Sequence, residues 1–275
     1  MILLKKVFWK LPRVVVLTVL KYRFNGKFLR PVTIKRYGTL IKLREITPRD
    51  NGRISEIYFY HPKRISRYFM GINERIDKLG REYCLDQIKS MPDGVIVDIG
   101  SNVGEFTLYL NGIYPNREFL RFEPSHTENL AAQANLAGIN QILIPKPCWS
   151  HITEVDFFNS NETGDSSIFK PYESVTSSKM QTTTLDTEVA ELRISKIALI
   201  KLEAEGAEPE ILLGAEKTLK ITKFITADLG PERGLAQERT FSEVHEALSK
   251  KGFKLIAKNP GDRECYLFEN MIVDN

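Results

Sequence analysis

The feature that most constrains the fold is an alternation of short apolar runs with helical patterns, which begins at residue 95. Apolar runs of the buried-strand type lie at 95–98, 117–122, 141–145, 197–202 and 224–227. Two further runs, 253–257 and 264–268, flank an Asn-Pro-Gly-Asp turn and predict a closing hairpin. Strands that alternate with helices typically form a parallel sheet covered by helices. The sequence therefore predicts an α/β domain.

The first 70 residues lack this alternation and differ from the rest in charge. Residues 1–50 hold thirteen Lys and Arg against two acids, whereas the remainder holds twenty-six against thirty-three. Residues 39–60 place apolar positions around the turn-like segment 48–52, which predicts a β-hairpin. We divide the chain into residues 1–70, a basic arm with an accessory β-hairpin, and residues 71–275, the main domain.

The basic arm suits an anionic surface, either lipid or nucleic acid. Residues 1–23 combine aliphatic, aromatic and basic side chains, as interfacial helices do, although Pro12 interrupts the pattern. No apolar run approaches the roughly 20 residues that a membrane-spanning helix needs. We expect either peripheral membrane contact through residues 1–27 or packing of the arm on its own domain or on a partner subunit.

The cysteines and histidines bear on the cellular compartment and on metal binding. Cys84, Cys148 and Cys265 are too few and too widely spaced for a disulfide framework or a zinc cluster. The four histidines are scattered, which argues against a histidine metal site. We expect a cytoplasmic protein, in peripheral contact with the inner membrane face if the arm binds lipid.

The segment that follows the run 95–98 carries the chemistry. Asp98-Ile-Gly100-Ser101-Asn102-Val-Gly104 forms a small-residue loop at the carboxyl edge of the sheet, where open α/β proteins bind ligands. Glu123 follows the next run, 25 positions after Asp98, near the spacing at which an acid reaches a ribose diol. Together these features predict an adenosine ligand. The alternative is a tight strand-to-helix turn that binds nothing.

The loop does not match a pyrophosphate site. The middle glycine of the Gly-x-Gly-x-x-Gly fingerprint is Asn102 here, and no third glycine has the right spacing. Asp98 and Glu105 would repel phosphates but favour a ligand with an ammonium and a sulfonium group, such as S-adenosylmethionine. In that interpretation Asp98 supports the loop or the methionine end of the cofactor, and Asn102 forms hydrogen bonds with its amino acid. Gly100 and Gly104, beside Ser101, leave room for the cofactor to approach the backbone. Glu123 accepts hydrogen bonds from the ribose hydroxyls. Cys148 and Trp149 would border the adenine.

Four ordered motifs make the chain resemble the FkbM-type methyltransferases over about residues 80–270. They are VDIGSNVGEFT at 97–107, FEP at 122–124, TTLD at 183–186 and IKLEAEGAEPEILLGA at 200–215. The resemblance implies a class I Rossmann-like three-layer sandwich whose seven-stranded, mostly parallel sheet has one antiparallel strand, the last. It also implies methyl transfer from S-adenosylmethionine to hydroxyl groups of sugars, glycolipids or polyketide-type products. Two positions depart from the family pattern, since Glu203 replaces its first aspartate and Asp228 replaces a glutamate.

Methyl transfer to a hydroxyl is an in-line displacement that needs positioning and a base. The acids Glu203, Glu205, Glu208 and Asp228 are candidates for that base, with Glu203 ranked first and Glu205 second. In the alternative interpretation Glu205 only holds a loop and Glu208 only caps a helix. Lys201 is either an ion-pair partner or a solvated side chain. We predict no metal site, although Glu203 and Asp228 could share a divalent ion.

We therefore expect an O-methyltransferase acting on a small-molecule, glycan or glycolipid acceptor, with residues 159–178 as an irregular loop long enough to be a lid. Nucleic acid is not expected as a partner, because the Pro147-Cys148 dipeptide is a weak signal and no Pro-Pro-Tyr-type motif occurs. Two competing hypotheses are an NAD(P)-dependent oxidoreductase and a non-catalytic nucleotide-binding module.

Overall fold

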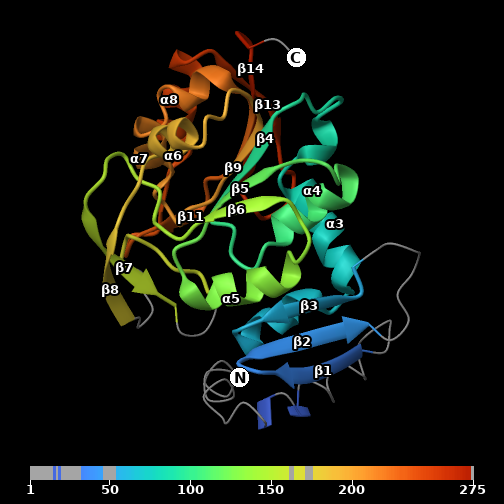
Figure 1. The fold of residues 1–275 in the computed structure, drawn as a ribbon. Helices are drawn as coiled ribbons and strands as arrows, with labels where there is room; N and C mark the ends of the chain where they lie inside the picture. Colours follow the sequence, from blue (N-terminus) through green and yellow to red (C-terminus); the bar gives the residue numbers. More distant parts are fainter. Residues whose placement is uncertain are drawn as a thin grey trace.

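A computed structural model describes residues 15–16, 18–19, 32–45, 54–160, 164–170 and 176–273. Its centre is a seven-stranded sheet with the strand order β13-β14-β10-β9-β4-β5-β6 (Figure 1). The strands are β4 (Val95–Ile99), β5 (Phe119–Phe122), β6 (Gln141–Ile144), β9 (Ile197–Leu202), β10 (Thr222–Asp228), β13 (Phe253–Lys258) and β14 (Cys265–Asn270). β14 runs antiparallel to both of its neighbours, and the other strands share one direction. The predicted sheet, with its last strand antiparallel, is confirmed.

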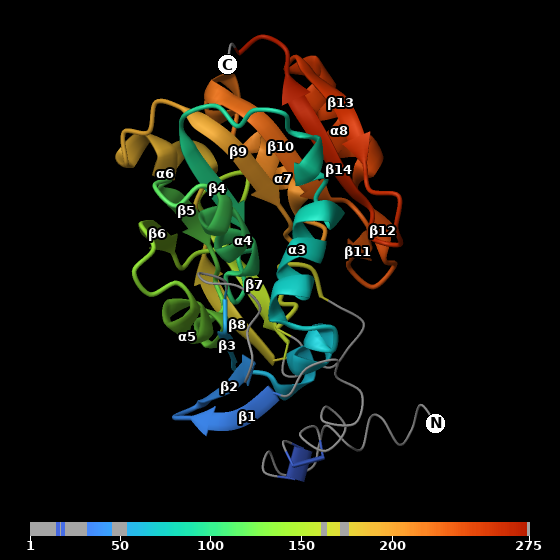
Figure 2. The same ribbon diagram turned by 90° about the vertical axis from the view of Figure 1, so that its right-hand side faces the viewer.

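Helices cover both faces of this sheet and make three layers (Figure 2). The helices are α3 (Ile72–Glu82), α4 (Glu105–Ile113), α5 (His126–Asn135), α6 (Leu185–Glu191), α7 (Glu208–Leu213) and α8 (Phe241–Lys250), and the short 3-10 helices are η1 (Pro62–Tyr68), η2 (Leu85–Gln87) and η3 (Thr218–Ile221). In strand β4, alternate residues pack against helices on opposite faces of the sheet. Val97 and Ile99 pack with α6, α7 and α8, whereas Ile96 packs with α3 and α4. Every residue of β4 is buried, as expected for a central parallel strand.

A second, antiparallel sheet lies beside α5 and consists of β1 (Val32–Tyr37), β2 (Leu40–Glu45) and β3 (Glu56–Phe59). The predicted hairpin at 39–60 corresponds to β2 and β3, and its turn lies outside the described residues. The apolar side chains of this sheet share a cluster with residues of α3, α4 and α5. Asn135 at the end of α5 pairs with both backbone groups of Tyr58, at 2.7 and 3.0 Å. The division at residue 70 stays a prediction.

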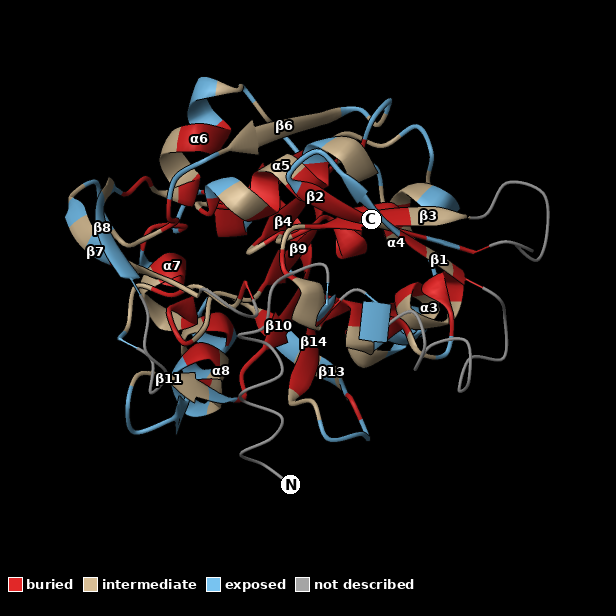
Figure 3. Ribbon diagram, turned by 90° about the horizontal axis from the view of Figure 1, so that it is seen from below, coloured by how far each residue is buried: buried red, intermediate tan, exposed pale blue. Residues whose placement is uncertain are grey.

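The segment 159–178 is more regular than the sequence indicated. β7 (Glu154–Asn159) and β8 (Thr176–Gln181) pair as an antiparallel ribbon, so the prediction of an irregular loop is wrong at both of its ends. The reason is that β8 is almost wholly exposed (Figure 3), and its polar residues show no alternation between a buried and a solvated face. A second small ribbon, β11 (Pro231–Arg233) with β12 (Glu238–Arg239), was not predicted either.

Most of the N-terminal arm, to which membrane contact was assigned, lies outside the described residues. Within the described part of the chain, each helix is too short or too polar to span a bilayer. The three cysteines are buried and free.

Candidate active site

The loop after β4 is built from residues with left-handed backbone conformations. Gly100 has φ +70°, Asn102 +49° and Gly104 +88°. The amides of Gly100 and Ser101 both donate to the carbonyl of Phe122, at 3.0 and 3.1 Å, which ties the loop to the end of β5. A Cβ atom on Gly100 would overlap the carbonyl oxygen of Glu203. Glycine is therefore needed where the loops after β4 and β9 approach each other.

Glu123 lies directly after β5 and faces this loop. One carboxylate oxygen accepts the Asn102 amide at 2.7 Å, and the other accepts the Ser125 amide at 2.8 Å. Burial raises the pKa of the Glu123 carboxyl to about 7. A buried carboxyl held by two backbone amides is well placed to accept further hydrogen bonds from a diol.

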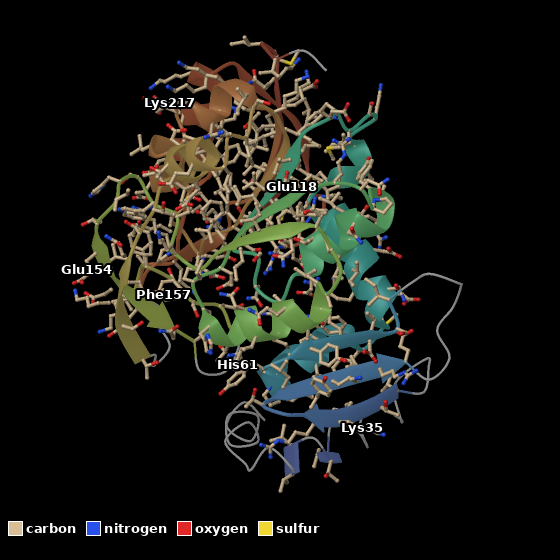
Figure 4. The ribbon with its side chains drawn as sticks, in the orientation of Figure 1. Lys35, His61, Glu118, Glu154, Phe157 and Lys217 are labelled. Carbon is tan, nitrogen blue, oxygen red and sulfur yellow. The ribbon has the colours of Figure 1, made fainter. Side chains whose placement is uncertain are left out.

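A single cleft joins this loop to the ends of the neighbouring strands. It encloses about 890 Å³ of space, part of it open to solvent. Five predicted cofactor residues line it, namely Gly100, Ser101, Asn102, Glu123 and Cys148. Phe122, Ile211 and the β7 residue Phe157 (Figure 4) add apolar wall. The cleft thus has an apolar end near Cys148 and a polar end near Gly100. Burial raises the pKa of the Cys148 thiol.

Three predicted cofactor residues are not among those that line the cleft. Asp98 is fully buried beneath the loop, where it accepts the Thr107 hydroxyl at 2.9 Å and lies 3.4 Å from the Lys201 ammonium. Gly104 packs on Leu136, which a Cβ atom would meet at 2.9 Å. Trp149 packs against the cluster behind the cleft, with its ring 6.0 Å from that of Phe169.

Lys201 is a buried ion-pair residue rather than a solvated one. Its ammonium donates to the carbonyls of Ile99 and Gly100, at 3.1 and 2.6 Å, and contacts Glu203 at 2.8 Å. It therefore links β9 to the glycine loop and balances the charge of Asp98.

Glu203 and Glu205 both line the cleft, but the groups around them carry opposite charge. Glu203 accepts a hydrogen bond from the Tyr83 hydroxyl at 2.7 Å and ion-pairs with Lys201 and Arg263. Burial alone would raise the pKa of Glu203, yet Arg263 and Lys201 hold it well below its ordinary range. Burial, and then the nearby carboxyls of Glu232 and Asp165, raise the pKa of Glu205 well above its ordinary range. Glu205 is the better proton acceptor of the two.

Asp228 lies outside the cleft, on an adjoining groove that Glu203 and Glu205 also line. Arg263, in the turn between β13 and β14, donates to Asp228 at 2.5 Å and also to Glu203. Its guanidinium occupies the position between these two acids that a shared divalent ion would need. The described residues contain no group of three or more His, Cys, Asp or Glu arranged to hold a metal ion.

Glu208 supports the loop that carries Glu205. Its carboxylate accepts the amides of Ala204 and Gly206, at 2.8 and 3.1 Å, and the Thr240 hydroxyl at 3.0 Å. Glu208 therefore holds the loop before α7 and does not cap that helix, whose first turn receives no hydrogen bond from a capping side chain.

The motifs did not indicate several polar residues of the cleft, which are Arg64, Arg67, Arg75, Tyr83 and Arg263. Most of them come from η1 and α3, which precede the glycine loop. Arg64 and Arg75 bind Glu105, at 3.1 and 3.2 Å. Burial alone would raise the pKa of Glu105, but the two arginines lower it to about 2. Asp98 and Glu105 are thus paired, so the sequence argument that they present free negative charge to a ligand is wrong.

The segment 164–170 covers part of the cleft. The side-chain amide of Asn102 donates to the Gly164 carbonyl at 3.0 Å, and the Ser167 hydroxyl donates to the Glu205 carbonyl at 3.2 Å. The Phe169 ring lies 4.2 Å from the Arg233 guanidinium. This part of the predicted lid therefore bridges the loops after β4 and β9.

Comparison with known proteins gives a consistent result. The family description "Methyltransferase FkbM domain" matches residues 98–255. The chain is 23% identical over 215 residues to the 2-O-methyltransferase NoeI of Sinorhizobium fredii, covering 72% of this chain and 88% of NoeI. It is also 23% identical over 210 residues to methyltransferase sdnD of Sordaria araneosa, covering 63% of this chain and 79% of sdnD.

Two solved structures align with this chain at lower similarity. A fibrillarin pre-rRNA processing protein of Methanococcus jannaschii aligns with a TM-score of 0.46 and 14% identity, covering 86% of this chain and 97% of fibrillarin. A precorrin-6y C5,15-methyltransferase of Geobacter metallireducens aligns with a TM-score of 0.39 and 14% identity, covering 68% and 86%.

Proposed function

Because the chain belongs to the FkbM methyltransferase family, we propose that it transfers a methyl group from S-adenosylmethionine to a hydroxyl of a sugar, a glycolipid or a related natural product. One observation carries this proposal: the same cleft holds Glu123, beside the glycine loop, and Glu205, a carboxyl with a raised pKa. The similarity to a 2-O-methyltransferase supports oxygen as the acceptor atom.

The residues of the cleft fit an adenosyl donor. Glu123 would accept the ribose hydroxyls, the wall near Cys148 and Phe122 would take the adenine, and the loop at Gly100 and Asn102 would lie along the amino acid. When bound, S-adenosylmethionine supplies an electrophilic methyl group on a sulfonium.

Glu205 is the proposed general base. A carboxylate with a raised pKa draws the proton from a hydroxyl more effectively than an ordinary one. The adjoining groove, lined by Glu203, Glu205, Asp228 and Glu232, would receive the acceptor. Burial and nearby carboxyls raise the pKa of Glu232 to about 9, so this group carries a proton at neutral pH and donates hydrogen bonds. Glu203 and Asp228 would position Arg263 and Tyr83 rather than take a proton.

Ligand binding separates this proposal from a nicotinamide-dependent oxidoreductase. Isothermal titration of the purified protein with S-adenosylhomocysteine and with NAD should give binding by the first ligand alone. Tight NAD binding without S-adenosylhomocysteine binding would overturn the proposal.

Turnover separates it from a non-catalytic binding module. The protein, incubated with S-adenosylmethionine and with lipid or polysaccharide extracts, should release S-adenosylhomocysteine. Mass spectra should show an acceptor heavier by one CH2 unit, because a methyl group replaces the hydroxyl hydrogen. A protein that binds the nucleoside but methylates no hydroxyl in such extracts would be a binding module.

The proposed location is the cytoplasmic side of a membrane that carries a lipid-linked acceptor. The basic character of residues 1–27 supports it. Deletion of these residues should abolish sedimentation with anionic liposomes, and retained sedimentation would remove the arm from membrane contact.

A further inference from the structure

The accessory sheet of β1, β2 and β3 has two chemically different faces. Because side chains alternate along a strand, the register places Ile34, Leu43 and Ile57 in one row, on the face that shares an apolar cluster with α3, α4 and α5. The sheet lies at the end of the molecule opposite the C-terminus (Figures 1 and 2). Its other face, called the outer face below, includes Lys35, Tyr37, Lys42, Arg44, Glu56 and Tyr58.

The outer face carries more bases than acids. Lys35 and Arg44 are exposed, and Lys42 is half-buried. Glu56 is the acid among the described residues of this face, and it contacts the Lys42 ammonium at 3.1 Å. Arg44, opposite Glu56 in the register, also helps to lower the pKa of its carboxyl. Three bases and one acid leave a net charge of two, and Arg36, exposed at the end of β1, adds a third.

Neighbouring segments of the chain do not balance this charge. Residues 1–31 contain eight Lys and Arg and no Asp or Glu, and residues 46–53 contain two arginines and one aspartate. Glu45 is buried on the inner face, where it accepts the Ile72 amide. Residues 51–275, in contrast, hold 33 acids against 26 bases. The molecule is therefore electrically polar, with its positive end at the accessory sheet.

An exposed aromatic ring stands among these cations. Tyr37 is 57% exposed, and its ring lies 5.3 Å from that of Tyr58. The Lys42 ammonium lies over both rings, at 5.3 and 5.0 Å from their centres. Lys42 and Tyr58 thus hold the Tyr37 ring in place while one side of it meets solvent. Tyrosine rings beside basic side chains are typical of the headgroup level of a membrane interface.

Exposed apolar side chains belong to the same end of the molecule. Val16 is 1% exposed and joins the apolar cluster of the accessory sheet. Val15 and Val19 are 39% and 37% exposed, and their spacing of four places them on one side of a helical turn. Apolar side chains next to cations favour a lipid bilayer over a nucleic acid, because a phosphate backbone gives them no apolar partner.

We propose that the outer face of the accessory sheet docks on an anionic lipid bilayer, with Lys35 and Arg44 at the headgroup phosphates and Tyr37 at the interface. The inference extends the proposed membrane location, which rests on residues 1–27 alone, and it does not depend on methyl transfer. An interfacial arm and a basic surface are two weak signals that together give stable anchoring. β3 leads directly into η1, which lines the cleft, so docking would hold the cleft near the bilayer.

Sedimentation of the full chain with vesicles of phosphatidylglycerol and phosphatidylcholine tests this docking. Lys35→Gln/Arg44→Gln should lower the partition coefficient about thirtyfold, because each Lys or Arg near an anionic surface contributes about fivefold. The matched control is Lys217→Gln/Lys220→Gln. It removes the same charge from exposed side chains, and Lys217 lies at the opposite end of the molecule from Lys35 (Figure 4). The control should change partition less than about twofold, because salt screens distant charges.

Two further measurements sharpen the test. Val15→Ser/Val19→Ser should also weaken vesicle binding, because it removes apolar side chains that would enter the interface. Thermal unfolding checks the fold of each variant. If Lys35→Gln/Arg44→Gln is unstable, Lys35→Gln alone decides, with an expected loss of about fivefold.

Equal losses in Lys35→Gln/Arg44→Gln and in the control, or no loss in the former, would overturn the inference and leave membrane contact to residues 1–27. Binding of a single-stranded oligonucleotide in place of vesicles, lost in the same variant, would make nucleic acid the partner and also overturn it. A wild type that ignores anionic vesicles would overturn both the inference and the proposed location. Release of S-adenosylhomocysteine would still test methyl transfer separately.

Discussion

The two sides of the cleft hold their acidic residues in different ways. On the side of β4 and β5, Glu123 is held by the backbone amides of Asn102 and Ser125, which are close to it in the chain or in the adjoining loop. On the side of β9 and β10, Glu203 is held by the side chains of Tyr83, Lys201 and Arg263. Backbone amides fix the position of a carboxylate, whereas charged side chains also set its proton affinity.

The comparison explains why neighbouring acids differ. Glu203 and Glu205 are two positions apart, yet the pKa of one is lowered and that of the other is raised. The difference comes from what each side chain meets: cations for Glu203, carboxyls for Glu205. The roles of these acids on the β9 and β10 side therefore depend on partners far away in the chain.

The largest effect should come from the base. Glu205→Gln should lower kcat by roughly 100-fold to 10,000-fold, because an amide cannot accept the hydroxyl proton. Binding of S-adenosylhomocysteine should change little, which titration of the same variant would check. Glu203→Gln, the matched variant, should lower kcat less and destabilise the fold more. If Glu203→Gln were the more severe in turnover, the base would be Glu203.

Removal of Arg263 tests the β9 and β10 side of the cleft, where charged side chains hold the acids. Arg263→Gln should lower the free energy of unfolding by about 3 kcal/mol, because Glu203 and Asp228 lose a shared cation in a largely buried place. Chemical denaturation would measure it. Arg239→Gln breaks an ion pair of Arg239, whose side chain is 60% exposed, and should cost less than about 1 kcal/mol. Equal losses in the two variants would contradict the assigned role of Arg263.

The pH dependence of turnover should report Glu205. Its raised pKa means that the carboxylate form is lost at a higher pH than for an ordinary glutamate. Turnover should therefore rise with pH, by up to about tenfold per unit, until the pKa of Glu205 is passed. Steady-state rates at saturating donor and acceptor would show it. A rate that is flat from acidic to alkaline pH would exclude Glu205 as the base.

The smallest effect should be the pH dependence of ligand affinity, which Glu123 sets on the β4 and β5 side of the cleft. Ribose hydroxyls donate to the ionised form of Glu123, whose pKa is about 7. Ligand binding favours that form, so affinity for S-adenosylhomocysteine should rise severalfold between about pH 6 and pH 8. Glu123→Gln should bind about tenfold more weakly and lose this dependence. A pH dependence that persists in the variant would assign it to another group.

Much of the fold was predictable because its signals are local. The strand at 197–202 appears with the predicted bounds, and β4 and β6 differ from prediction by a single residue. Apolar runs and turn residues record which segments are buried, and parallel order follows from their alternation. The ribbon of β7 and β8 was missed because it is exposed and polar, so burial left no periodic pattern in its sequence.

The site residues likewise fall into those that local sequence predicts and those that depend on distant segments. The sequence by itself determined the glycine loop and Glu123, because a left-handed turn and a backbone-held acid need particular residues at fixed short spacings. It also identified Glu203, Glu205 and Asp228 as a group of acids. Only the tertiary structure decided what each acid does, since Arg263 and Tyr83 arrive from distant segments and Arg64 from an element ahead of the motifs. Proton affinity depends on burial and charge in three dimensions, and neither is written in the spacing of residues along the chain.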